Sequence, residues 1–295
     1  MKKIILPVLS VLFMYSCDVV ESPYTKNDNT TIIDTSSNNS FMKKIIVEEF
    51  TGHLCPGCPE AARELELISE VYGDQVIPIA MHVTKSFARP YTSSQAPKFQ
   101  YDFRTFWGDY IDNFYEVSLD GLPRGMVNRI GYPNNHKIGW QEWASTIENE
   151  LAKEINFGIS IETSENNISV NTTVTESIDG NFNIAVCLIE DNIVNWQKDS
   201  TAEVSDYIHK HVLRSYLMEE NLSNSSNYLN NQEINKSISY NLENLEQYNI
   251  EYSENTVELG NGNAGGWNED YLYVVAYIYN SSTNEIVQAE KQKLK

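Results

Sequence analysis

The sequence is poor in basic residues. Lys and Arg together number 21, against 41 Asp and Glu, and the formal net charge is −20 at pH 7. A surface this acidic repels the phosphates of nucleic acids and the headgroups of anionic lipids. Nucleic acid is therefore excluded as a partner. The acidic excess is concentrated after residue 155, where 21 acidic side chains accompany only 7 basic ones.

Long apolar runs are also missing. The best candidate, residues 4–14, is shorter than the roughly 20 residues that span a bilayer. It follows two lysines and precedes Cys17, an order typical of a bacterial lipoprotein signal peptide. The sequence therefore predicts a signal over 1–17, a lipid on Cys17 that anchors the chain to a membrane, and a flexible polar tether over 18–42. The alternative is an ordinary secretory signal with an incidental cysteine.

Cysteine is scarce as well, since only Cys55, Cys58 and Cys187 remain after Cys17. An exported protein resides where disulfides persist, and three cysteines allow at most one pair within the chain. The close spacing makes Cys55 and Cys58 the expected pair. Cys187, which lies among apolar strand residues, is expected to be a buried free thiol.

A zinc site needs four ligands, and the chain has no second pair of cysteines with the same spacing. The only other ligand-like pair is His209 and His211, which would share one face of a strand. A Cys2His2 site is therefore a minor alternative. We predict neither a metal nor a cofactor.

Cys55 and Cys58 lie between a predicted strand and a predicted helix. Residues 44–50 are rich in β-branched and aromatic side chains, and apolar residues from 61 to 72 recur with helical spacing. A thiolate at a helix N-terminus faces free N–H groups and the positive end of the helix dipole, which lower its pKa. We expect Cys55 to be the exposed attacking thiol and Cys58 the buried resolving thiol. A static disulfide is the alternative.

Further predicted strands at 75–83 and 124–130 and a helix at 140–151 complete an α/β domain. The insertion at 84–120 carries aromatic residues that recur as one helical stripe. These are Phe99, Phe103, Phe106, Tyr110 and Phe114. We interpret the stripe as the packing face of a helical subdomain, with an aromatic substrate cradle as the alternative.

From residue 155 the apolar period changes from helical to two, which predicts half-buried strands. Residues 155–295 are expected to form an antiparallel, immunoglobulin-like β-sandwich of seven or eight strands. The predicted fold class is thus α/β plus all-β, with an α/β domain over 43–154 followed by the β-sandwich.

The first domain resembles the thioredoxin superfamily. The strand that ends in Val47-Glu48-Glu49-Phe50, the run Cys55-Pro56-Gly57-Cys58 and the pair Leu122-Pro123 carry the resemblance. It implies that Pro123 is cis and, with the backbone of Leu122, binds an extended peptide beside the two cysteines. It also implies that Glu49 is the buried acid that exchanges protons with Cys58. By this placement His53 and His82 are expected at the rim of the peptide site, where His53 would contribute to substrate binding.

The whole chain is similar to the family of envelope lipoproteins related to the twenty-eight-kilodalton outer-membrane protein. The similar stretches are residues 47–52, 55–59, 123–129, 206–214, 277–280 and 286–290. The resemblance implies a lipid-anchored outer-membrane protein that combines a thioredoxin-like domain with a β-sandwich. The expected function is thiol–disulfide exchange with envelope or surface proteins. The alternative is a non-catalytic binding or adhesion lipoprotein in which the Cys55–Cys58 disulfide is structural.

Overall fold

The computed structural model describes residues 41–295, which form one compact unit. The predicted signal peptide, the lipid site at Cys17 and nearly all of the predicted tether lie outside the described residues. No helix in the described part of the chain has the length and apolar character to cross a membrane.

The first half of the described chain contains three strands and four α-helices. They are β1 (Ile45–Thr51), α1 (Cys58–Tyr72), β2 (Val76–His82), α2 (Lys85–Ala88), α3 (Phe106–Tyr115), β3 (Arg124–Val127) and α4 (Trp143–Leu151). This order agrees with the strands and helices that the sequence predicts on either side of residues 84–120.

The second half is mostly β. It contains β4 (Phe157–Ser164), β5 (Asn167–Val174), β6 (Ile178–Asp179), β7 (Phe182–Glu190), β8 (Ile193–Asp199), β9 (Ala202–His209), β10 (Val212–Asn221), β11 (Asn227–Tyr228), β12 (Glu233–Ser239), α5 (Leu242–Asn255), β13 (Leu272–Asn280) and β14 (Ile286–Lys293). The change of apolar period near residue 155 therefore marks a real change from mixed to strand structure.

The two halves share one sheet. Its seven strands follow the order β14-β13-β7-β10-β2-β1-β3, so β10 joins strands of the second half to β2 of the first. The predicted arrangement of an α/β domain beside a separate β-sandwich does not describe this sheet. The physical reason is that β2 pairs with β1 along one edge and leaves its other edge unpaired. β10 covers that edge, where the N–H of Ala80 donates to the carbonyl of His211.

Pro78 explains how β2 accepts β10 as a neighbour. Pro78 lies two residues before Ala80, so the position where its N–H would be faces β10. β10 pairs with β2 only at Val212 and Ala80, and the missing donor therefore removes no bond from the ladder. A proline that argues against a central strand is tolerated because the contact between the two strands is so short.

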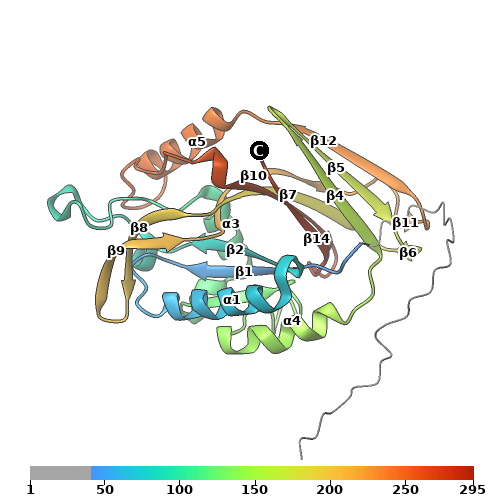
Figure 1. Cartoon of the computed structure of the whole chain (residues 1–295), viewed down its shortest axis with the longest axis horizontal. Helices are drawn as coiled ribbons and strands as arrows, with labels where there is room; N and C mark the ends of the chain where they lie inside the picture. Colours follow the sequence, from blue (N-terminus) through green and yellow to red (C-terminus); the bar gives the residue numbers. More distant parts are fainter. Residues whose placement is uncertain (1–40) are drawn as a thin grey trace, which may run out of the picture. The chain divides into compact units, whose positions relative to one another are not determined.

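Two layers cover the two ends of one face of the sheet, and α3 packs on the opposite face. α1 and α4 pack on β1 through an apolar cluster that includes Val47, Leu65 and Trp143, and Figure 1 shows these two helices beside β1. A second antiparallel sheet of three strands, β12-β5-β4, packs on β7 and β13. The predicted sandwich is thus present only as this smaller sheet against one end of the large one.

The aromatic stripe is only partly helical. Phe106, Tyr110 and Phe114 lie on α3, whereas Phe99 and Phe103 lie in irregular chain and are fully buried. The prediction of one helical stripe is wrong because α3 begins only after Thr105, whose hydroxyl caps the helix by accepting from the N–H of Gly108 at 3.0 Å. Phe99 has a φ of 51°, which a right-handed helix does not allow.

Candidate active site at the Cys55–Cys58 disulfide

Cys55 and Cys58 form the predicted disulfide between β1 and α1, with their Cα atoms 5.4 Å apart. Cys58 is the first residue of α1, and Pro59 and Glu60 follow in the first turn, where a fixed φ and a negative charge both favour a helix start. The sulfur of Cys58 therefore lies at the positive end of the helix dipole. Cys187 is the buried free thiol that the sequence predicts.

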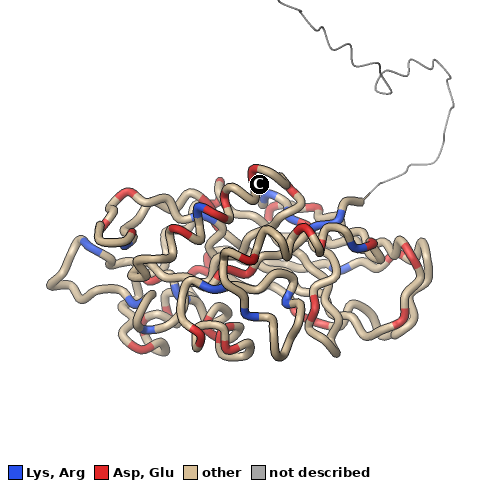
Figure 2. Tube along the Cα trace, turned by 90° about the horizontal axis from the view of Figure 1, so that it is seen from below, with Lys and Arg blue, Asp and Glu red and all other residues tan. Residues whose placement is uncertain are grey.

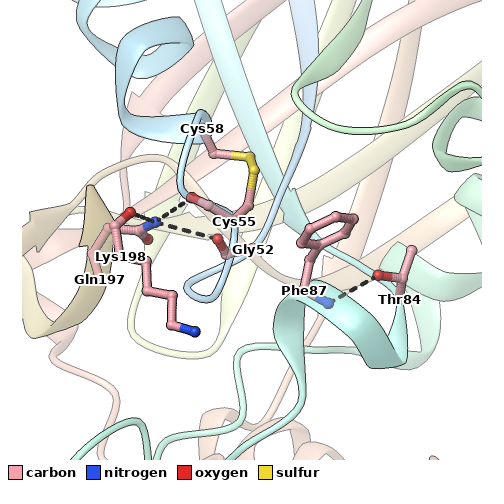
Figure 3. The surroundings of a disulfide bond; sticks show 7 residues. All are labelled: Gly52, Cys55, Cys58, Thr84, Phe87, Gln197 and Lys198. Atoms are coloured by element: carbon pink, nitrogen blue, oxygen red, sulfur yellow. Dashed lines mark hydrogen bonds between the residues drawn. A yellow bond between two sulfur atoms is a disulfide. The ribbon is translucent and has the colours of Figure 1, made fainter. Parts of the chain in front are cut away.

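Gly52 shapes the loop before the disulfide. A Cβ atom at this position would lie 2.3 Å from the carbonyl oxygen of Phe87, so only glycine allows α2 to approach this closely. The same carbonyl accepts the N–H of Leu54 at 2.8 Å, and the Thr84 hydroxyl accepts the N–H of Phe87. These contacts, drawn in part in Figure 3, fix the chain that leads into Cys55.

The disulfide is covered. Cys55 is 1% exposed and Cys58 is 2% exposed, so the prediction that Cys55 is an exposed thiol is wrong. The cover is the hairpin of β8 and β9, which forms a two-stranded sheet of its own. The position at a helix start suggests an exposed thiol. The β8–β9 hairpin, which follows more than 130 residues later in the sequence, packs over it and buries it.

Backbone and side-chain hydrogen bonds hold the hairpin against the disulfide loop. The N–H of Lys198 donates to the carbonyl of His53 and the N–H of Ser200 to the carbonyl of Pro56, both at 2.8 Å. The buried amide of Gln197 donates to the carbonyls of Gly52 and Cys55, at 3.3 and 3.1 Å. Figure 3 shows Gln197 and Lys198 beside this loop. The loop thus obtains its hydrogen-bond partners from β8.

Two ion pairs also connect α1 with the hairpin and the residue that follows it. Arg63 pairs with Asp199 at 2.9 Å, and Lys210 pairs with Glu66. All four side chains are substantially exposed, so water and salt screen both attractions. Their contribution to holding the hairpin is therefore small compared with that of the buried hydrogen bonds.

Glu49 lies on the α1 side of β1 and is buried. Within residues 41–295 no ion pair or hydrogen bond reaches its carboxyl, and burial raises its pKa to about 7. Glu49, Cys58 and Tyr207 line one cavity of about 30 Å³, which has room for a water molecule. A carboxyl that is about half ionised near neutral pH and Cys58 thus line the same small cavity.

A larger groove reaches Glu49 from outside. It measures about 840 Å³, runs between α1 and β9, and is lined by residues that include Leu65, Tyr207 and Ile208. Glu49 and Tyr207 line both the groove and the small cavity. Glu49 therefore lies between the groove and the Cys58 cavity.

The buried histidines do not lie at a rim. His53 and His82 are almost completely buried, so their predicted rim position is wrong, and the side chain of His53 bonds to the carbonyl of Arg89 at 2.9 Å. Burial lowers the pKa of His53 to about 4 and that of His209 to about 3. These imidazoles are neutral near pH 7, and they pack with Phe99 and Phe103 under the disulfide loop.

Pro123 lies next to the disulfide loop, and the Leu122–Pro123 peptide bond is cis. A Cβ atom placed on Gly57 would lie 3.6 Å from Cδ of Pro123, which puts this proline against the residue between the two cysteines. Leu122 is half-buried and packs on the core. The structure thus brings together Glu49, Cys58 and Pro123, and places the side chain of His53 in the core instead of at a substrate site.

The zinc alternative fails on geometry. β9 ends at His209, which is buried, and His211 follows in a left-handed conformation and pairs with Asp191. The two imidazoles therefore do not share a strand face. No group of three or more potential metal ligands occurs among residues 41–295.

Sequence reasoning missed Gln197, the backbone of Lys198 and Ser200, and Tyr207. Gln197 is a buried polar residue in an otherwise half-exposed strand, but a single glutamine carries no local signal of its partner. Acidic residues occur along the whole described trace, as Figure 2 shows, so charge does not identify the site either.

The family model described as Outer membrane protein Omp28 matches residues 109–295. The chain belongs to the Omp28 family. The match includes Pro123, the β8–β9 hairpin and most of the large sheet, and it begins after the two cysteines. Membership agrees with the predicted location in the cell envelope. No curated protein sequence matches this chain.

Three solved structures are similar to this chain. HBP35 of Porphyromonas gingivalis has a TM-score of 0.55 and 15% identity, over 86% of this chain and 76% of that chain. A protein from Agrobacterium tumefaciens has a TM-score of 0.51 and 12% identity, over 86% and 96%. A domain of the outer membrane lipoprotein Omp28 from Porphyromonas gingivalis has a TM-score of 0.26 and 13% identity, over 48% and 91%. The first two establish a shared fold.

Proposed function

We propose that this Omp28 family member exchanges thiols and disulfides with other envelope or surface proteins through a thioredoxin-like unit built around Cys55 and Cys58. The observation that carries the proposal is the cavity that Cys58 shares with Glu49. A structural disulfide needs no buried carboxyl beside it, and burying an unpaired acid costs stability. A carboxyl with a pKa near neutrality is suited to proton transfer at a thiol.

The exchange proceeds in two steps. In the reduced form the Cys55 thiolate attacks a disulfide of the partner, forms a mixed disulfide and releases one partner thiolate. The Glu49 carboxylate then takes the proton of Cys58, and the Cys58 thiolate attacks the sulfur of Cys55 and releases the second partner thiolate. Two electrons pass from the cysteine pair to the partner disulfide, and the reverse sequence oxidises a partner dithiol.

The surrounding residues have supporting roles. Pro123 lacks an N–H, so the Leu122–Pro123 backbone beside Gly57 offers a surface on which an extended segment of the partner can lie next to Cys55. A lipid on Cys17 would hold the enzyme at the outer membrane, where such partners occur. The proposed activity requires no cofactor.

The β8–β9 hairpin limits access to Cys55, and we therefore expect that loosening the hairpin speeds reduction of the disulfide. The Gln197→Ala variant loses two buried hydrogen bonds to the disulfide loop, so its disulfide should be reduced roughly five- to tenfold faster than that of the natural protein. The rate is measured under excess phosphine by alkylation and mass spectrometry. The matched control is Gln247→Ala on the exposed side of α5. Equal rates in all three proteins would contradict hairpin-limited access.

The equilibrium reduction potential of the Cys55–Cys58 pair tests the proposed function itself. It is measured in a chain with Cys17→Ser and Cys187→Ala, so that only this pair titrates. We expect a value between roughly −120 and −270 mV, the window of exchange enzymes. A value below about −300 mV would identify a structural bridge and overturn the proposal.

The burial of both cysteines favours a second candidate function. In this candidate the disulfide fixes the loop between β1 and α1, and the chain acts as a binding or adhesion lipoprotein. The reduction potential separates the two functions, because a structural bridge resists reduction whereas an exchange site cycles between its two forms.

A further inference from the structure

A second cavity lies on the other face of β1. Glu48 and Glu49 are consecutive strand residues, so their side chains point to opposite faces of the sheet. Glu49 points to the Cys58 cavity. Glu48 points to Arg129, which lines a cavity of about 260 Å³ between α3 and the strands β7, β10 and β13. The two cavities are therefore separated by the sheet.

Arg129 and three tyrosines form the floor of this cavity. Arg129 donates to both carboxylate oxygens of Glu48, to Tyr115 at 3.0 Å and to Tyr277 at 2.8 Å. The hydroxyls of Tyr277 and Tyr216 are 2.6 Å apart. Because the two-point pair with Glu48 neutralises the guanidinium, the floor presents polar groups without net charge.

The floor of the cavity has more hydrogen-bond donors than acceptors to bind them. The Tyr115 hydroxyl accepts from Arg129 and has no acceptor for its own proton among the described residues. The Tyr216–Tyr277 pair has two hydroxyl protons and one shared hydrogen bond, so one proton remains. One N–H of the Arg129 Nη1 atom is also unused within residues 41–295. Residues that line the cavity thus carry three donors without an acceptor in the described chain, and buried donors require acceptors.

Acceptors lie farther along the same strands, on β7 and β10. Glu219 accepts from the Tyr279 hydroxyl at 2.7 Å through one carboxylate oxygen, and its other oxygen has no partner within residues 41–295. Asn183 donates to the same hydroxyl at 2.9 Å, while its Oδ1 atom is buried and has no partner in the described chain. The residues that line the cavity therefore offer both donors and acceptors to a molecule inside it.

The mouth of the cavity is aromatic. Trp107, Tyr110 and Phe114 share one face of α3, and Tyr110 and Phe114 are each 48% exposed. Large exposed aromatic side chains beside a polar cavity are typical of a binding site and unusual for a packing face. This part of the aromatic stripe thus fits the substrate cradle that the sequence left as an alternative.

We propose that this cavity binds a single neutral sugar ring. A ring with several hydroxyl groups both accepts and donates hydrogen bonds, and its C–H face stacks on aromatic side chains. An anion is disfavoured because Arg129 is neutralised and Glu219 is negative, and a cation is disfavoured by the three donors on the floor. The cavity is slightly smaller than the roughly 300 Å³ at which pockets for drug-sized ligands begin, which suits one ring.

The test uses the full chain with intact cysteines and a panel of neutral methyl glycosides: glucoside, galactoside, mannoside and N-acetylglucosaminide. Saturation-transfer NMR detects binding, and titration gives the Kd, which we expect on the order of 1 mM for at least one of them. Glucuronate and choline serve as anionic and cationic probes. The proposal is overturned if no glycoside binds at about 20 mM or if only a charged probe binds.

Three variants connect the binding to the cavity. Trp107→Ala should weaken it about tenfold by removing a stacking face. Tyr115→Phe keeps the ring and removes one donor, so it should weaken binding roughly fivefold, and it remains informative if Trp107→Ala unfolds. Tyr271→Phe, on an exposed tyrosine outside the cavity, should leave the Kd unchanged. Equal affinity of Tyr115→Phe and the natural protein would also overturn the proposal. None of these outcomes depends on exchange at Cys55.

Discussion

Replacing Arg129 by methionine should lower the free energy of unfolding by about 3–5 kcal/mol, as the removal of one partner from a buried ion pair does. The carboxylate of Glu48 is fully buried and binds the guanidinium through two hydrogen bonds. Without Arg129 that charge remains in the core with no partner. Urea unfolding at neutral pH measures the loss.

Two further variants give this prediction its controls. Glu48→Gln combined with Arg129→Met removes the buried charge, so the double variant should recover most of the lost stability. Arg63→Met removes an arginine that is 57% exposed and paired with Asp199 on the surface, and it should cost less than about 1 kcal/mol. If Arg129→Met costs no more than Arg63→Met, the Glu48–Arg129 pair contributes nothing to the core.

Replacing Glu49 by glutamine should stabilise the protein at alkaline pH by about 3 kcal/mol, because one pKa unit corresponds to about 1.4 kcal/mol. Glu49 has a pKa of about 7 in the folded protein and an ordinary value of 4.5. Below the ordinary pKa, Glu49 is protonated in both the folded and the unfolded protein, and it does not lower the free energy of unfolding. As the pH rises, the unfolded chain ionises first, so stability falls until the folded protein also ionises near pH 7.

The measurement is urea unfolding of the oxidised protein at intervals from about pH 4 to about pH 8. The difference between the natural protein and Glu49→Gln isolates this carboxyl from other titrating groups. Glu70→Gln, on the exposed side of α1, should show no such difference. A constant difference across the range would mean that Glu49 keeps its ordinary pKa and is not suited to proton transfer at Cys58.

The two neighbouring glutamates show how tertiary contacts assign different properties to similar residues. Glu48 and Glu49 both lie in β1 and are both buried. Glu48 has a guanidinium partner, and Glu49 has a cavity beside a sulfur. The alternation of a strand predicts that they face opposite ways, but their partners come from the turn after β3 and from α1, which fold onto the strand from different directions.

The sequence by itself determined the features that depend on near neighbours. The strand before Cys55, the helix from Cys58 and the disulfide between them follow from patterns within about thirty residues, because periodicity and short spacing act locally. The resemblance to a known family supplied the cis peptide before Pro123 and the burial of Glu49, both of which the structure contains.

Tertiary structure alone decided what covers and surrounds those features. The amide of Gln197 bonds to the carbonyl of Cys55 across 142 residues, and Arg129 reaches Glu48 across 81. The single sheet arises in the same way, from the pairing of β10 with β2. Such contacts depend on which strand edges and unpaired polar groups meet when the whole chain packs. A local sequence pattern does not predict these long-range partners.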